Sequence, residues 1–146
     1  GLLSLAGIPD IDMLKELIAN HPDTPSVVLD AISPGASDNV LQRICEHQNC
    51  SRKLLTLLAD HKSCEVRMAV IENPNTPIEK IHVLAQDDCV DVRFRMAEAV
   101  NMMNEVLEEL VLDENPYVSN RASTTLVRKQ FESEGRQWDL HKAACQ

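Results

Sequence analysis

Two stretches of the chain read almost alike: "HPDTPSVVLDAIS" at residues 21–33 and "NPNTPIEKIHVLA" at residues 73–85. They lie 52 residues apart, and the chain aligns with itself at half that offset, 26 residues, without gaps from about residue 14 to about residue 126. An internal period of roughly 20 to 50 residues is typical of solenoids, in which similar units stack side by side. The repetition therefore predicts a stacked helical or strand unit of 26 residues.

Four apolar columns run through this alignment. The first consists of Leu14, Val40, Val66, Val92 and Val118. The other three begin at Ile18, Leu29 and Ile32 and are equally apolar in each later copy. An ordinary globular domain places its apolar residues according to the geometry of each element, without one fixed period. The columns therefore predict copies of one unit that share an elongated hydrophobic core.

One unit can be read from its helix signals. In the copy at residues 73–99, Thr76 is predicted to cap a helix whose first residue is Pro77, where a missing N–H costs nothing. Apolar residues with helical spacing follow as far as residue 85, and a second short helix is predicted at about residues 91–98. Alternating strand patterns are absent from the sequence. The predicted fold class is all-α, without a β-sheet.

The copy at residues 64–85, "CEVRMAVIENPNTPIEKIHVLA", resembles the repeat of the leucine-rich repeat variant family, "D-x-x-x-x-V-R-x-x-V-A-x-N-P-x-T-P-x-x-x-L-x-x-L-A". HEAT-like repeats share its "VR" helix and acidic turn. The resemblance implies a right-handed α-solenoid, a superhelix in which short α-helices alternate with 3₁₀ or short α segments. Val100 and Met103 stand where the pattern has Pro74 and Pro77. We therefore expect a more continuous helix at that boundary than at the others.

The predicted domain organisation is a single helical-repeat domain over residues 1–146. About four to five repeats are expected over roughly residues 8–127. The period breaks in "RKQFESEGRQWDLHKAACQ", residues 128–146, which we expect to form a capping helix segment. There Phe131, Trp138 and Leu140 are predicted to cover the last repeat, with a bend at Gly135.

Composition narrows the possible partners. A formal net charge of −9 disfavours phosphate backbones and anionic lipid, and an aromatic content of 3% leaves few side chains to stack on bases. No apolar run reaches the roughly 18 residues that a membrane span requires. The five cysteines are an odd number and lie in apolar or helical stretches, which favours reduced thiols. We expect a cytoplasmic protein with no membrane contact.

Candidate chemical groups are few. Cys45, His47 and Cys50 in "CEHQNC" could ligate a metal, but they lack a C-x-x-C pair and align with helix and turn positions of other copies. Buried thiols are the favoured interpretation, and a role in a turn is favoured for His21 and His47. The scattered cysteines do not predict an iron–sulfur segment. With no catalytic constellation and only four glycines, we expect no cofactor, no metal and no enzymatic activity.

Arginines form the most informative polar pattern. One column holds Arg67 and Arg93, and a second, interrupted by Ala69, holds Arg43, Arg95 and Arg121. Three interpretations stay open. The arginines could bond acidic turns at Asp60, Asp87 and Asp113 and tie each repeat to the next. They could instead form a basic stripe for an acidic peptide, or face DNA as the groove of HEAT-like DNA glycosylases does.

Two classes of function follow. The leading prediction is a non-enzymatic scaffold that binds a protein or acidic peptide through an extended curved surface. The alternative is a HEAT-like protein associated with nucleic acid, or a DNA-repair enzyme, that uses the arginine columns. The acidic composition makes nucleic acid the less favoured partner. Weak self-association through the apolar end repeats also remains open.

Overall fold

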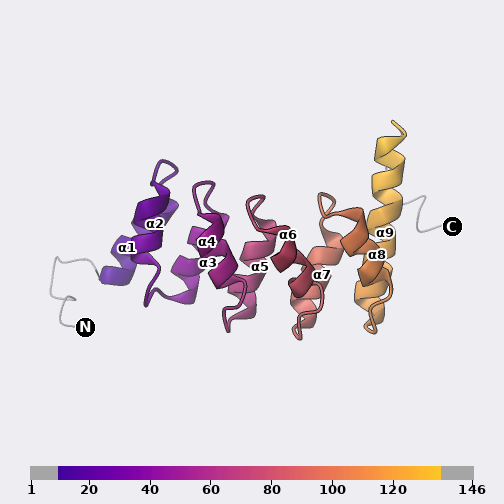
Figure 1. The fold of residues 1–146 in the computed structure, drawn as a ribbon, viewed down its shortest axis with the longest axis horizontal. Helices are drawn as coiled ribbons and strands as arrows, with labels where there is room; N and C mark the ends of the chain where they lie inside the picture. The colour runs from indigo at the N-terminus through magenta and orange to yellow at the C-terminus, as the bar shows by residue number, and fades with distance from the viewer. Residues whose placement is uncertain (1–9, 136–146) are drawn as a thin grey trace. The chain divides into compact units, whose positions relative to one another are not determined.

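The structure is a computed structural model, and it describes residues 10–135. Over this range the backbone forms nine α-helices and no strand, so the predicted all-α class is confirmed (Figure 1). The helices are α1 (Ile11–Asn20), α2 (Ser26–Ile32), α3 (Asp38–Glu46), α4 (Arg52–Leu58), α5 (Cys64–Glu72), α6 (Ile78–Leu84), α7 (Val90–Glu98), α8 (Asn104–Val111) and α9 (Pro116–Ser133).

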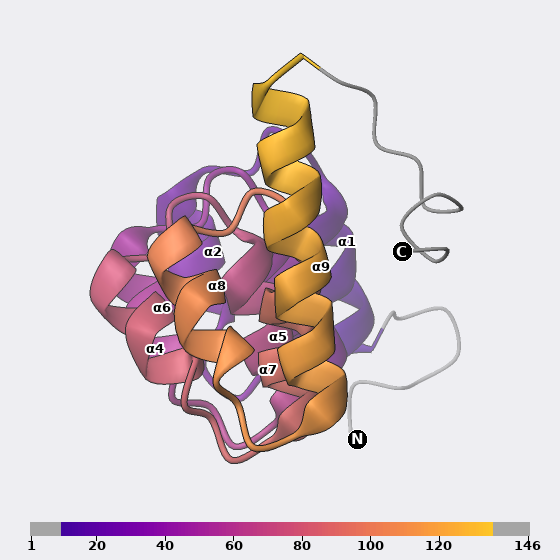
Figure 2. The same ribbon diagram turned by 90° about the vertical axis from the view of Figure 1, so that its right-hand side faces the viewer.

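The chain divides into two compact units, Gly1–Leu84 and Ala85–Gln146. The first unit contains α1 to α6, and within it α3 packs against both α1 and α5. The second unit contains α7 to α9, and its long last helix α9 packs against both α7 and α8 (Figure 2). Each unit therefore buries its own set of helix faces.

The helices recur at even intervals along the chain. Helices α2, α4, α6 and α8 begin at residues 26, 52, 78 and 104. Helices α3, α5, α7 and α9 begin at residues 38, 64, 90 and 116. Apart from α9, all are short, and isolated helices below about 12 residues are marginal in water. Packing against neighbouring helices must therefore supply most of their stability.

The repeated apolar positions fill the core of the first unit. Val40 in α3 and Val66 in α5 are 1% and 0% exposed, and Leu29 in α2 and Leu55 in α4 are both 0% exposed. Full burial of one such side chain stabilises the fold by about 1.5 to 3 kcal/mol relative to exposure. These four column residues thus hold the short helices together, whereas Leu14, the first member of the column that contains Val40 and Val66, is 43% exposed.

The second unit has the same kind of core. Val92 and Met96 on α7, Leu107 on α8, and Val118 on α9 are all fully buried. A polar contact closes the seam between α7 and α9, because the buried Thr125 hydroxyl donates a hydrogen bond of 2.5 Å to the Ala97 carbonyl. These contacts join α7 and α9, the two longest helices of the unit.

Thr76 lies in the turn before α6, but its hydroxyl serves the preceding helix. It donates a hydrogen bond of 2.5 Å to the carbonyl of Val70 in α5, and Thr24 donates one of 2.6 Å to the carbonyl of Ile18 in α1. The last carbonyls of a helix lack partners within it, and these hydroxyls supply one. The prediction that Thr76 caps α6 is wrong, because the Pro77 carbonyl accepts the first hydrogen bonds of that helix.

The boundary at Val100 and Met103 is a turn, so the prediction of a more continuous helix there is wrong. In this turn the Ala99 N–H donates to the Met96 carbonyl, and the Met102 N–H donates to the Ala99 carbonyl. The same two backbone hydrogen bonds form between α5 and α6, where the prolines are present. Met102 is buried where that turn has a threonine. Backbone hydrogen bonds and burial therefore maintain the turn without proline.

The last helix is longer than predicted. Residues 128–133 are its final turns, and not the start of a separate capping helix, because neither proline nor glycine interrupts the chain between Pro116 and the end of the helix at Ser133. The predicted bend at Gly135 is confirmed, since this residue has a φ of 75° and its N–H donates to the Glu132 carbonyl. Trp138 and Leu140 lie outside the described residues.

Leu55→Ala tests whether the buried columns hold the fold. We expect a loss of about 2 to 5 kcal/mol in the free energy of unfolding, because a fully buried leucine leaves a cavity. Leu57→Ala on the same helix is the matched control, since Leu57 is 68% exposed and its change should stay within about 0.5 kcal/mol. Urea unfolding followed by circular dichroism measures both, and equal losses would contradict the core assignment.

Candidate partner-binding surface

Two of the five predicted arginines point into turns. The Nη1 of Arg67 donates to the His61 carbonyl at 2.6 Å, and the Nη1 of Arg93 donates to the Asp87 carbonyl at 2.6 Å. Donors and acceptors are each 26 residues apart in sequence, so equivalent positions make the same bond. Hydrogen bonds from a charged donor are among the stronger ones. These two arginines therefore hold the turns that precede α5 and α7.

Arg93 also makes an ion pair. Its Nε lies 2.8 Å from Oδ2 of Asp113, and its Nη2 lies 3.4 Å from Oδ1. The hydrogen bond to Asp113 raises the pKa of Arg93 against the opposing effect of burial. The predicted bond between an arginine and an acidic turn is thus present at Arg93. Asp60 is instead paired with Lys80, at 3.0 Å.

A hollow of about 400 Å³ surrounds this ion pair in the second unit. Its lining includes one cation, Arg93, and five carboxylates: Asp87, Asp88, Glu109, Asp113 and Glu114. Because Arg93 is already bonded to Asp113, the remaining surface of the hollow is negatively charged. This part of the unit repels acidic partners.

The other three arginines are exposed. The side chains of Arg43, Arg95 and Arg121 are 46%, 44% and 45% exposed, on α3, α7 and α9 respectively. Arg43 lies 3.4 Å from Glu46, Arg95 lies 3.4 Å from Glu98, and Arg121 lies 3.9 Å from the same Glu98. Exposed ion pairs contribute only about 0 to 1 kcal/mol. Little free energy therefore opposes their exchange for a partner's carboxylate.

In the second unit, Arg95 and Arg121 lie on one surface with Glu98 and Tyr117. We call these four residues the arginine face. Helices α7 and α9, which carry it, pack side by side (Figure 2). Tyr117 lies one helical turn before Arg121 and is 76% exposed. On α9 no acidic residue lies within one turn of Arg121. The arginine face thus combines an aromatic ring with a guanidinium that shares its carboxylate.

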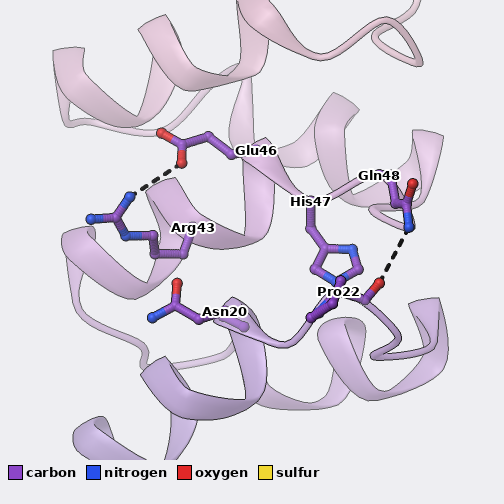
Figure 3. Close-up of a pocket in the computed structure, with 7 residues that line it drawn as sticks. Asn20, Pro22, Arg43, Glu46, His47 and Gln48 are labelled. Atoms are coloured by element: carbon purple, nitrogen blue, oxygen red, sulfur yellow. Dashed lines mark hydrogen bonds and ion pairs between the residues drawn. The ribbon is translucent and has the colours of Figure 1, made fainter.

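In the first unit Arg43 borders a hollow of about 380 Å³ between the ends of α1 and α3 (Figure 3). The hollow is lined by Ala19, Asn20, Pro22, Arg43, Glu46, His47 and Gln48. Figure 3 shows the Arg43–Glu46 ion pair on one side and the 3.3 Å hydrogen bond from Gln48 to the Pro22 carbonyl on the other. Its floor is therefore built by turn residues of two successive copies.

The His47 ring is fully engaged at this hollow. Its Nδ1 accepts a hydrogen bond of 2.9 Å from the Asn49 N–H, and its Nε2 lies 2.8 Å from the His21 carbonyl. A carbonyl can only accept, so the hydrogen of the neutral ring is assigned to Nε2. His21 Nδ1 similarly accepts from the Asp23 N–H at 3.1 Å. The turn role predicted for both histidines is confirmed, and neither ring nitrogen of His47 is available for a metal.

The neighbouring cysteines are poor ligands as well. Cys45 and Cys50 are buried, and burial raises the pKa of the Cys50 thiol to about 12 and that of Cys45 well above its usual value. A metal binds the thiolate, which these thiols form only with difficulty. In the described part of the chain, no group of three or more histidine, cysteine or acidic residues could hold a metal ion.

Comparison of the chain with protein-family models, with curated proteins and with solved structures found no match in any of the three. Within residues 10–135, no helix has both the length and the apolar character required to cross a bilayer.

Two features of these surfaces were not predicted from the sequence: the exposed Tyr117 and the hollow beside Arg43. Tyr117 aligns with Asn39, Glu65 and Asp91, so an aromatic residue in a polar, solvent-facing column was a usable signal. The hollow beside Arg43 gave no such signal. Its walls come from turns whose packing depends on hydrogen bonds between residues 26 apart, such as the bond from Gln48 to the Pro22 carbonyl.

Arg93→Gln tests the division of the arginines into two classes. We expect a loss of about 1.5 to 3 kcal/mol in unfolding free energy, because a largely buried, charge-assisted hydrogen bond to Asp113 is removed. Arg95→Gln, two residues away and exposed, should change stability by less than about 0.5 kcal/mol. Denaturant unfolding of both variants measures the difference, and a larger loss for Arg95→Gln would reverse the assignment.

The buried thiols give a second prediction. An alkylating agent at pH 8.5 should modify Cys64 and Cys89, which are partly exposed, well before Cys45 and Cys50. Raised pKa values keep the buried pair in the unreactive thiol form, and burial also blocks the reagent. Peptide mass spectrometry at timed intervals measures the order of labelling. In urea all four should react alike, and fast labelling of Cys45 without urea would show that its helix is open.

Proposed function

We propose that the protein is a non-enzymatic α-solenoid scaffold, built from 26-residue repeats like those of the leucine-rich repeat variant family, that binds another protein. The even spacing of helix starts supports this proposal, since α4, α6 and α8 begin 26, 52 and 78 residues after the start of α2. In a solenoid each unit completes its core against its neighbours and exposes a long surface. A right-handed superhelix and a cytoplasmic location belong to the same proposal.

Hydrogen bonds between successive copies also support the repeat. His47 Nε2 bonds the His21 carbonyl, and Asn73 Nδ2 bonds the His47 carbonyl at 3.1 Å; both bonds span 26 residues. Bonds of constant sequence span are expected when identical turns stack in register.

The partner we propose is an acidic peptide segment, and the observation that carries this choice is the arginine face of the second unit. There two guanidinium groups, Arg95 and Arg121, share the Glu98 carboxylate, and Tyr117 is exposed beside Arg121. Tyrosine and arginine, with tryptophan, are enriched among the side chains that dominate binding energy at interfaces. A carboxylate of the partner would take over Arg121, whose present pair with Glu98 is the longer one at 3.9 Å.

Binding of fluorescent peptides rich in Asp and Glu, read by anisotropy, tests this proposal. We expect the full chain to bind some of them, and Arg121→Glu to weaken binding by roughly tenfold or more, about 1.4 kcal/mol. Arg128→Glu is a matched control, because Arg128 lies on the same helix, is 45% exposed and also pairs with a glutamate, at 3.0 Å. Its charge reversal should leave the affinity almost unchanged.

Equal effects of the two reversals would indicate non-specific attraction and contradict a site at the arginine face. Duplex DNA is tested in the same assay at low salt. A DNA complex that Arg121→Glu abolishes, with no peptide bound, would favour the alternative of a nucleic-acid-associated protein.

A further inference from the structure

The guanidinium group of Arg43 has an edge with no partner from the described residues. Arginine carries five N–H donors. In Arg43 the Nη1 lies 3.4 Å from Oε2 of Glu46, and none of the described residues accepts a hydrogen bond from Nε or Nη2. The side chain is 46% exposed and borders the hollow of about 380 Å³ in the first unit. Two parallel donors are therefore available at the rim of a concave surface.

The same edge of another arginine binds a carboxylate in this protein. Arg93 directs its Nη1 to a turn carbonyl, and its Nε and Nη2 bond the two oxygens of Asp113 at 2.8 and 3.4 Å. A fork of two N–H donors matches the two oxygens of a carboxylate, which makes such contacts both strong and directional. Arg43 also engages its Nη1, at Glu46, so its remaining edge has the geometry that receives a carboxylate at Arg93.

Comparison of the copies shows why the first unit supplies no carboxylate from the preceding copy. In the second unit Arg121 lies 3.9 Å from Glu98, which precedes it by 23 residues. Arg43 stands in the same column as Arg121, and the residue 23 positions before Arg43 is Asn20. Asn20 lines the hollow, and its amide lies on the side of Arg43 opposite Glu46 (Figure 3). An amide that can donate hydrogen bonds thus replaces the carboxylate.

The floor of the hollow is held in place by hydrogen bonds between turns. The His47 ring bonds the His21 carbonyl at 2.8 Å, and Gln48 donates to the Pro22 carbonyl at 3.3 Å. Ala19 and Pro22 add apolar surface to the lining. The volume lies within the range of about 300 to 1,000 Å³ that small-molecule sites occupy, and a preformed hollow loses little entropy when a ligand binds. A short carbon chain can therefore lie on this floor.

We propose that this hollow binds a carboxylate carried on a short carbon chain, as in a glutamate side chain or a small organic acid. The two oxygens accept hydrogen bonds from Nε and Nη2 of Arg43, and the Asn20 amide donates to one of them. Glu46 keeps its bond to Nη1, so the ion pair within α3 is retained. The site lies in the first unit and shares no residue with the arginine face.

Titration of the isotope-labelled full chain, followed by the amide shifts in NMR spectra, tests this site. The probes are N-acetylglutamate N-methylamide, which represents a peptide side chain, the free acid glutarate, and the neutral glutaramide. We expect at least one carboxylate to bind with a Kd on the order of 1 mM and to shift amides of residues 19–22 and 43–48. Glutaramide should shift none of them. The tighter of the two carboxylates identifies a peptide or a free acid as the source.

Asn20→Glu is the most informative variant. It places at residue 20 the carboxylate that Glu98 supplies to Arg121, so it should engage Arg43 and weaken binding by roughly tenfold or more in a folded protein. Arg43→Gln should have a similar effect, because it removes the charged fork. Arg128→Gln is the matched control, since Arg128 is 45% exposed, also pairs with a glutamate and lies outside this hollow. Its affinity should be unchanged.

Three results would overturn the proposal. The first is that neither carboxylate shifts the amides around the hollow, and the second is that Arg43→Gln and Arg128→Gln have equal effects. The third is that Asn20→Glu, with a spectrum that shows a folded chain, binds as tightly as the original protein. Amide shifts report each residue separately, so a failure at this hollow is distinguishable from a failure at the arginine face of the second unit.

Discussion

The structure depends on one constraint: a helix of seven to ten residues cannot bury its apolar side by itself. Helix α4 shows this clearly, because Leu55 is inaccessible to water and yet its helix has only seven residues. Isolated, such a helix is marginal, since the entropy of ordering its backbone is not offset. Contact with adjacent helices supplies the missing burial. None of these short helices is therefore stable without its neighbours.

Packing the turns closely creates a second requirement. Where helices end every 26 residues, carbonyl groups of the turns become buried and need donors. Asn73 meets this need by donating to the Cys45 carbonyl at 2.7 Å and to the His47 carbonyl at 3.1 Å, while its own oxygen accepts from the Asn75 N–H. In the described part of the chain, no buried side-chain nitrogen or oxygen lacks a hydrogen-bond partner. Turn residues such as Asn73 therefore both connect successive copies and supply hydrogen-bond donors to their buried carbonyl groups.

The difference between apolar burial and hydrogen bonding in the turns explains what the sequence could predict. Most of the apolar columns were predictable, because the period and the hydrophobicity that mark Val40 and Val66 as buried are visible in one sequence; Leu14, in the same column, is exposed. The turns were less so. A threonine before a proline can cap the next helix or bond the last carbonyls of the previous one. Only the structure shows that Thr76 bonds the previous helix, at the Val70 carbonyl. The sequence separated the arginines into two columns, but it did not show which acceptors the fold brings near each one, such as a turn carbonyl for Arg67 and Glu98 for Arg95.

The distribution of charge over the protein determines how the exposed arginines could act as a binding site. In a protein with a net charge of −9, most of the surface repels an acidic segment, and Arg93 is already committed to Asp113. Repulsion elsewhere disfavours non-specific docking, so a single attractive place gains selectivity from its acidic surroundings. Within the second unit, Arg121 has the exposure, the weakly held partner and the adjacent aromatic ring that such a place requires. An acidic composition therefore does not argue against an acidic partner; it restricts where that partner can bind.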